Sequence, residues 1–158
     1  MDIREVLKTI EGFSELSDGE IERLASIAEL RSAKAGSSID VQGQPATMFG
    51  VLVTGRLGVV LNLDLGVVHQ TYQVTTVGPG EMFAWSAMVG NPYYTAGSKC
   101  LTDCQYLAFD AGRLRQEFDR DPKLGYVVMK LVAKTIASRL RHMQLKLAQQ
   151  YAFSESAE

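Results

Sequence analysis

A glycine-containing turn followed by a short helix is the part of the sequence best suited to binding a small molecule. Pro79-Gly80 predicts the turn, and residues 83–88 predict the helix. Such a turn presents unpaired backbone N–H groups, which favour a phosphate or another anion. Thr95 can add a hydroxyl from a facing strand. We therefore expect a ligand site within residues 78–96, formed by Gly80, Phe83, Ala84, Trp85, Ser86, Ala87, Tyr93, Tyr94, Thr95 and Ala96.

The other reactive side chains do not form a recognisable catalytic or metal-binding pattern. Cys100 and Cys104 are four residues apart, which is roughly 13 Å in an extended strand and too far for a disulfide without a bend. His69 and His142 are remote from each other in the sequence. A cupin-like metal enzyme, which would cluster histidines on neighbouring strands, is therefore the least favoured function. We expect no metal, no cofactor and no enzymatic activity.

Composition indicates one globular domain. The 158 residues are 46% hydrophobic and 22% charged, with a formal net charge of −2. The basic residues near the C-terminus occur at helical spacing, which is typical of a solvated helix face: Lys130, Lys134, Arg139, Arg141 and Lys146. No apolar run is long enough for a membrane span or a secretory signal, so we expect a cytoplasmic protein.

The first 29 residues predict two helices. Residues 2–10 carry an amphipathic pattern. Ser17 and Glu20 form a capping box, which predicts that a second helix begins at Asp18 and ends near Glu29.

From about residue 30 to residue 109, short segments rich in Val, Leu, Thr and Tyr are separated by frequent glycines. Turn signals at this density predict an antiparallel jelly-roll, or β-roll. Thr54-Gly55-Arg56 and residues 62–66 each predict a hairpin turn. We expect strands near residues 30–34, 38–42, 47–54, 56–62, 67–77, 96–101 and 104–109.

Residues 110–150 predict a short helix at 110–119 and a long one from about 122 to 150, followed by a flexible tail at 151–158. Asp121 as the N-cap and Pro122 as the first helical residue mark the start of the long helix. A helix of about 28 residues extends roughly 42 Å, more than one small barrel covers. We therefore expect its stripe to serve both the barrel and a second copy of the chain: Leu124, Val128, Leu131, Val132, Thr135, Ile136, Leu140, Met143 and Leu147.

The order of these elements and several local motifs resemble the cyclic-nucleotide-binding domain of the catabolite activator (Crp/Fnr) superfamily. The motifs are residues 16–18, 35–43, 48–57, 77–83 and 96–110, followed by Asp121-Pro122. The likeness extends over about residues 10–145. It implies a β-roll sensor with a long C-terminal helix that pairs two subunits.

Two positions depart from the family's binding cassette, which reads approximately Phe-Gly-Glu and then Arg-Thr/Ser-Ala. Trp85 stands where the resemblance implies the ribose-binding Glu, and Tyr94 stands where it implies the phosphate-binding Arg. No arginine lies between Arg56 and Arg113 to replace it. Losing two charge-assisted hydrogen bonds costs about 3–6 kcal/mol, or roughly 10²–10⁴ in affinity. We therefore expect no tight binding of cAMP or cGMP.

Two interpretations of the pocket stay open. Trp85, Ser86, Tyr93, Tyr94 and Thr95 either line a site for a less charged ligand or simply fill the cavity of a scaffold that binds other proteins. Because the sequence ends at residue 158 without the family's helix-turn-helix, we expect no direct DNA binding. The predicted partners are an unidentified small-molecule ligand, a second copy in a homodimer, and a protein partner, with no membrane association.

Overall fold

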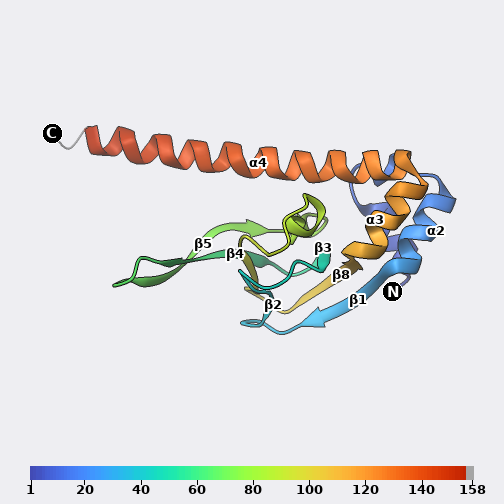
Figure 1. Cartoon of the computed structure of the whole chain (residues 1–158), viewed down its shortest axis with the longest axis horizontal. Coiled ribbons are helices and arrows are strands. Elements are labelled where there is room, and N and C mark those ends of the chain that lie inside the picture. The colour runs from blue at the N-terminus through green and yellow to red at the C-terminus, as the bar shows by residue number, and fades with distance from the viewer. Residues whose placement is uncertain (156–158) are drawn as a thin grey trace.

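Two four-stranded antiparallel sheets form the body of the protein in a computed structural model, which describes residues 1–155 (Figure 1). The first sheet contains, in spatial order, β1 (Ala28–Ala33), β8 (Cys104–Asp110), β3 (Met48–Thr54) and β6 (Met82–Phe83). The second contains β2 (Ser38–Asp40), β7 (Gly97–Cys100), β4 (Leu57–Asp64) and β5 (His69–Val77). The predicted jelly-roll is confirmed.

Helices precede and follow the sheets. They are α1 (Ile3–Thr9), the 3₁₀ turn η1 (Phe13–Glu15), α2 (Asp18–Ile27), the 3₁₀ turn η2 (Trp85–Met88), α3 (Ala111–Arg120) and α4 (Pro122–Glu155). The predicted capping box is present, since Ser17 Oγ accepts from the Glu20 amide and the Glu20 carboxylate accepts from the Ser17 amide. The helix α4 continues to Glu155, past its expected end near 150. The last residues of the expected tail, 156–158, lie outside the described residues.

One of the two predicted hairpins is wrong. Strands β4 and β5 do form a hairpin, closed by a bond from Leu65 N to Val68 O of 3.0 Å. At Thr54-Gly55-Arg56, however, the chain passes from the first sheet to the second, so β3 and β4 are not paired. Gly55 has φ +91°, and a Cβ there would lie 2.3 Å from Asp103 O. The glycine permits a crossing between sheets rather than a hairpin.

The two cysteines do not lie along one extended strand. The chain bends between β7 and β8, so Cys100 and Cys104 lie on different sheets and both contribute to the core between them. Burial, with a smaller effect from the Cys104 thiol, raises the pKa of Cys100 to about 11. Both thiols are free, and the raised pKa keeps Cys100 protonated near neutral pH.

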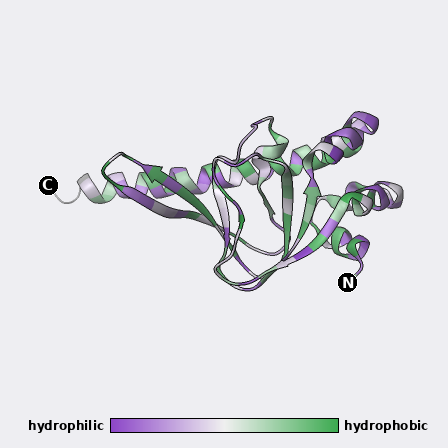
Figure 2. Ribbon diagram, turned by 60° about the horizontal axis from the view of Figure 1, so that its bottom comes forward, coloured by the Kyte–Doolittle hydropathy of each residue, from purple (hydrophilic) through white to green (hydrophobic). Residues whose placement is uncertain are grey.

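Two hydrophobic clusters hold the fold together. One lies between the first sheet and the helices and includes Leu124, Val128 and Val132 of α4; the other lies between the two sheets. Beyond Val132 the helix leaves the core and extends alongside the β4–β5 hairpin (Figure 1). Hydrophilic residues interrupt the hydrophobic ones along this outer half (Figure 2). Among the described residues, no helix has the length and apolar character needed to cross a membrane.

Candidate functional site

The predicted turn and helix of the ligand site consist of a strained residue followed by one short helical turn. Ala84 has φ 55° and ψ 33° immediately before η2. Within residues 1–155 it is the only residue other than glycine with a positive φ. An L-residue in this left-handed conformation costs about 1–2 kcal/mol. The strain shows that the neighbouring structure, rather than local preference, determines the shape of this segment.

A cavity of about 40 Å³ lies beside this turn. Ala84, Trp85 and Ser86 line one side of it, and Tyr94, Thr95 and Ala96 line another. These six predicted residues are therefore brought together. The lining also includes residues that the sequence did not indicate: Asp40, Val59, Gly97, Ser98 and Arg139.

The other predicted ligand residues lie elsewhere. Phe83 is fully buried between the sheets, with its ring edge-on to Tyr106 at 5.7 Å between centroids. Ala87 is buried in the hydrophobic cluster between the first sheet and the helices. Tyr93 is 54% exposed, and Gly80 lines a groove outside the cavity. The spacing that suggested these residues did not show which face of the turn each one occupies.

A pair of hydroxyls joins the two sides of the cavity. Ser86 Oγ lies 3.1 Å from Thr95 Oγ1 and accepts a hydrogen bond of 3.3 Å from the Thr95 amide. These contacts hold η2 against the segment that leads into β7. They place Thr95 beside the short helix, and a role for its hydroxyl in ligand binding stays a prediction.

Tyr94 is held by backbone groups rather than left free for a ligand. Its hydroxyl accepts from Met48 N at 3.0 Å and donates to Met48 O at 3.1 Å. Burial of the side chain raises the pKa of Tyr94. The Tyr94 hydroxyl is thus neutral and already has its hydrogen-bond partners.

Asp40 places a carboxyl group inside the barrel. The residue is only 5% exposed, and its Oδ2 has no hydrogen-bond partner. Burial raises the pKa of Asp40 to about 6, although hydrogen bonds from Ser98 oppose the rise. The pairing of β2 with β7 shifts register between Ser38 and Asp40. Such an irregularity changes which face a side chain occupies, so simple alternation along the strand could not have revealed this group.

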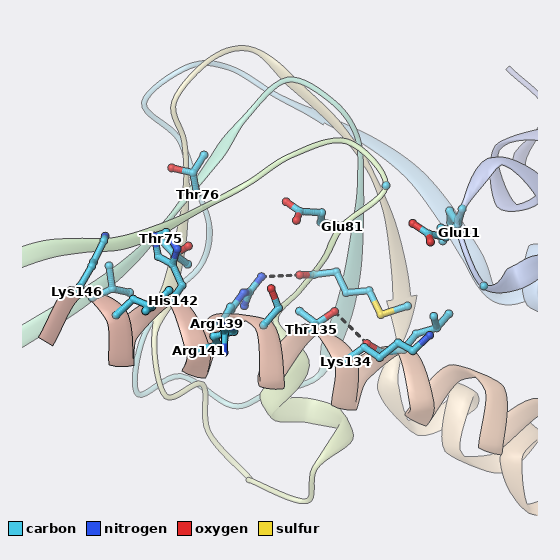
Figure 3. A pocket seen from close by; sticks show the side chains of 18 of the residues that line it. Glu11, Thr75, Thr76, Glu81, Lys134, Thr135, Arg139, Arg141, His142 and Lys146 are labelled. Atoms are coloured by element: carbon cyan, nitrogen blue, oxygen red, sulfur yellow. Dashed lines mark hydrogen bonds between the residues drawn. The ribbon is translucent and has the colours of Figure 1, made fainter. Parts of the chain in front are cut away.

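Arg139 of α4 also lines this cavity, and Figure 3 shows its side chain from the side of the larger groove. Its Nη2 donates to Met82 O at 2.7 Å. Burial lowers the pKa of Arg139, and the nearby Glu81 carboxylate opposes that change. The expectation of a solvated basic face is therefore wrong at this residue. Its spacing on the helix resembles that of exposed neighbours, and only its contact with the Met82 carbonyl distinguishes it.

A larger groove of about 1080 Å³ lies outside the cavity. It runs between α4 and the segments that contain Thr75, Thr76 and Glu81 (Figure 3). Glu11 lies at the end of the groove that is nearer to the start of α4. Arg139 lines both the groove and the cavity.

The fold and site define a jelly-roll ligand-binding domain with a cassette and a closing helix. The family model of the cyclic nucleotide-binding domain matches residues 30–121, and the chain belongs to that family. The conserved order of elements that suggested the resemblance is thus confirmed. No curated protein sequence matches the chain.

Solved structures show the same fold. A Geobacter metallireducens protein described as cyclic nucleotide-binding is 24% identical, with 89% of this chain and 99% of that chain covered and a TM-score of 0.75. The Thermus thermophilus catabolite activator protein is 22% identical, with 89% and 62% covered and a TM-score of 0.68. A regulatory subunit of a cAMP-independent protein kinase A from Trypanosoma brucei, a triple mutant bound to cAMP, is 20% identical, with 90% and 49% covered and a TM-score of 0.72.

The strain at Ala84 predicts that Ala84→Gly stabilises the protein. Relief of the left-handed conformation contributes about 1–2 kcal/mol, and the greater freedom of glycine in the unfolded chain offsets about 0.4–1 kcal/mol. We expect the free energy of unfolding to rise by about 0.5–1 kcal/mol in urea titrations. The matched control is Ala137→Gly on the exposed face of α4, which should lower it by about 1 kcal/mol. A loss of stability in both variants would contradict the account of the turn.

The buried Asp40 predicts a pH-dependent gain from Asp40→Asn. The pKa of this carboxyl is about 6 in the folded protein against an ordinary 3.8, so the folded state holds a proton that the unfolded state releases between these values. The contribution of this carboxyl to the free energy of unfolding therefore falls as pH rises from 4 to 6, by at most about 3 kcal/mol. We expect the variant to be more stable than the parent at pH 7.5 and to lose that advantage at pH 4. Asp119→Asn, on an exposed residue of α3, is the control; equal advantages at both pH values would refute the burial effect.

Proposed function

We propose that the chain is a regulatory domain of the cyclic-nucleotide-binding fold whose cassette does not bind cAMP or cGMP tightly. The observation that carries the proposal is the cavity itself. Its volume of about 40 Å³ compares with about 300–1,000 Å³ for typical small-molecule sites. It also contains the Asp40 carboxylate, which would repel a nucleotide phosphate in a weakly screened interior.

The groups lining the cassette support the same conclusion. Trp85 occupies space where the family resemblance implies a sugar, and the Tyr94 hydroxyl is already bonded to Met48. Arg139 supplies a positive charge from outside the cassette. That charge is engaged by the Met82 carbonyl and lies near Glu81, so it is not an unpaired counter-ion waiting for a phosphate.

The known relatives favour regulation over catalysis. They include a catabolite activator protein and a kinase regulatory subunit. The Trypanosoma subunit is described as part of a cAMP-independent kinase, and the form bound to cAMP carries three substitutions, one of which introduces an arginine. By analogy, we infer that this chain also uses the fold without responding to the usual nucleotide.

Nucleotide binding is directly measurable. Calorimetric titration of the chain with cAMP and with cGMP should give dissociation constants well above about 10 μM, because two charge-assisted contacts are replaced. A domain with established cAMP binding, titrated in the same buffer, is the positive control. Binding at or below about 10 μM would overturn the proposal.

We also propose that the outer half of α4 pairs two copies of the chain. Leu124, Val128, Leu131 and Val132 of the predicted stripe are buried within the subunit, and Thr135 and Ile136 are half-buried. Leu140, Met143 and Leu147 continue the stripe but are 55%, 46% and 52% exposed. Spacings of three and four residues place these side chains on one helix face, as in a two-helix seam. The same surface on each copy would close an isologous dimer.

The double variant Leu140→Glu/Met143→Glu should separate the dimer. It removes two apolar contacts per subunit, worth together at least about 3 kcal/mol, so the dissociation constant should rise more than 100-fold. Light scattering coupled to gel filtration at high micromolar concentration gives the mass. Gln144→Glu, on an exposed residue of the same helix segment, should remain dimeric. A monomeric parent protein at that concentration would refute the dimer.

The alternative function, a scaffold with a filled interior, has one specific observation in its favour. Both backbone groups of Met48 are engaged by the Tyr94 hydroxyl, which is the arrangement expected of a packing residue. The unpartnered oxygen of Asp40 argues against complete filling, because it leaves a polar group without a partner beside empty space.

A further inference from the structure

One edge of β5 is not paired with another strand. The strand is the last of the second sheet, and within residues 1–155 it pairs only with β4. Half of its backbone N–H and C=O groups therefore point away from the sheet. Proteins usually protect such an edge with lysine, proline or a covering segment. Between His69 and Val77 the strand contains neither lysine nor proline, so this edge can accept a further strand.

The groove of about 1080 Å³ lies along this edge. Four consecutive residues of β5 line it: Gln73, Val74, Thr75 and Thr76. Successive side chains of a strand point to opposite faces, so a lining of this kind requires the edge of β5, rather than one face, to adjoin the groove. The register with β4 shifts at Val74, but Thr75 and Thr76 still alternate. Because β4 covers the other edge, the unpaired backbone groups of β5 face the groove.

The outer half of α4 forms the facing wall. Ser138 and Leu145 are among the helix residues that line the groove. The exposed stripe residues Leu140, Met143 and Leu147 are not part of the lining. At about 3.6 residues per turn, they lie roughly opposite Ser138 and Leu145 around the helix. A helix pair formed along that stripe would therefore lie on the other side of α4 from the groove.

Charge is distributed unevenly along the groove. Lys146 and His142 lie toward one end and Glu11 toward the other (Figure 3), and Arg141 also contributes to the lining. In the part of the chain that the structure describes, neither Arg141 nor Lys146 forms an ion pair. These two cations are therefore available to acidic groups of a ligand.

We propose that the groove binds an extended peptide segment of a protein partner, which adds a strand to the edge of β5 and places acidic residues against Arg141 and Lys146. In this mode of recognition, main-chain hydrogen bonds supply affinity and alternate side chains supply specificity. The surface lies along β5 and α4, so the proposal does not depend on what the cassette binds.

The acidic residues of the groove favour a peptide over a nucleic acid. Glu11, Glu15 and Glu81 line the same groove as the cations. They would repel a ligand with a negative charge at every unit, whereas a peptide can carry its acidic residues at one end only. The formal net charge of −2 also disfavours a nucleic acid.

Fluorescence anisotropy with a labelled peptide tests the proposal. The probe is fluorescein-labelled Thr-Val-Thr-Val-Glu-Glu-Glu amide, in which the first four residues favour an extended strand and the glutamates supply the charge. One control peptide has lysines in place of the glutamates. A second is N-methylated at every amide of the Thr-Val segment, so it cannot donate hydrogen bonds to a strand edge. A labelled oligothymidylate of seven nucleotides represents a nucleic acid.

We expect the acidic peptide to bind with a dissociation constant below about 300 μM, and at least about 10-fold more tightly than either control peptide. Added salt should weaken binding, because exposed charges are screened. The double variant Arg141→Glu/Lys146→Glu should lower the affinity at least about 10-fold. The control Arg56→Glu/Lys99→Glu makes the same change of net charge at exposed positions outside the groove and should leave the affinity nearly unchanged.

A variant that blocks the groove without changing its charge locates the site. Ser138→Trp places a large side chain in the groove, so the affinity should fall at least about 10-fold. Ala137→Trp, at an exposed neighbouring position that does not line the groove, should retain binding. Circular dichroism and urea unfolding establish that each variant is folded.

The proposal is wrong if the acidic peptide shows no saturable binding at about 1 mM protein, a concentration that detects even weak association. Equal binding of the lysine peptide would refute the role of the cations, and equal binding of the N-methylated peptide would refute strand addition. Binding that neither groove variant weakens would place the site elsewhere. Tighter binding of the oligothymidylate would assign the groove to nucleic acid instead.

Discussion

The hydrogen bond from Arg139 to the carbonyl of Met82 links the long helix to the binding cassette. Its length is 2.7 Å, and it lies at the point where α4 leaves the hydrophobic core, since Val132 is the last fully buried residue of that helix. Without this contact the outer half of α4 would be connected to the barrel only through half-buried side chains. The position of the Arg139 guanidinium therefore depends on how α4 packs against the rest of the domain.

This link connects the two properties proposed for the protein. The outer half of α4 carries the exposed apolar residues Leu140, Met143 and Leu147, and Arg139 lies next to the first of them. The surface proposed to pair two copies therefore begins beside the contact that joins α4 to the Met82 carbonyl.

Inside the barrel, bulky neutral side chains and one buried carboxyl group together shape the cavity. Trp85 and Tyr94 are neutral and bulky, and the Tyr94 hydroxyl is bonded to both backbone groups of Met48. Asp40 brings a negative charge into the same small space, where burial raises its pKa to about 6. With these groups in place, the cavity that remains has a volume of about 40 Å³.

The sequence by itself determined the order and type of nearly all the elements. Hydrophobic periodicity and glycine turns identified the strands, and the Ser17–Glu20 capping box located the start of α2 at Asp18. These signals are local, because a cap or a repeat is formed by residues close together in the chain. The departures at Trp85 and Tyr94 were likewise visible from the motif in which they stand.

Tertiary structure decided which residues meet in the cavity. Asp40 faces inward where the register of β2 against β7 shifts, and Arg139 lines the cavity from α4, where its guanidinium donates to the Met82 carbonyl. Gly55 crosses between sheets rather than closing a hairpin for a similar reason, since its position is set by Asp103 and Cys104 on a distant strand. Each of these features depends on contacts between segments far apart in sequence, and local patterns carry no information about such contacts. The sequence therefore determined the β-roll, whereas the three-dimensional packing determined which side chains line the cavity within it.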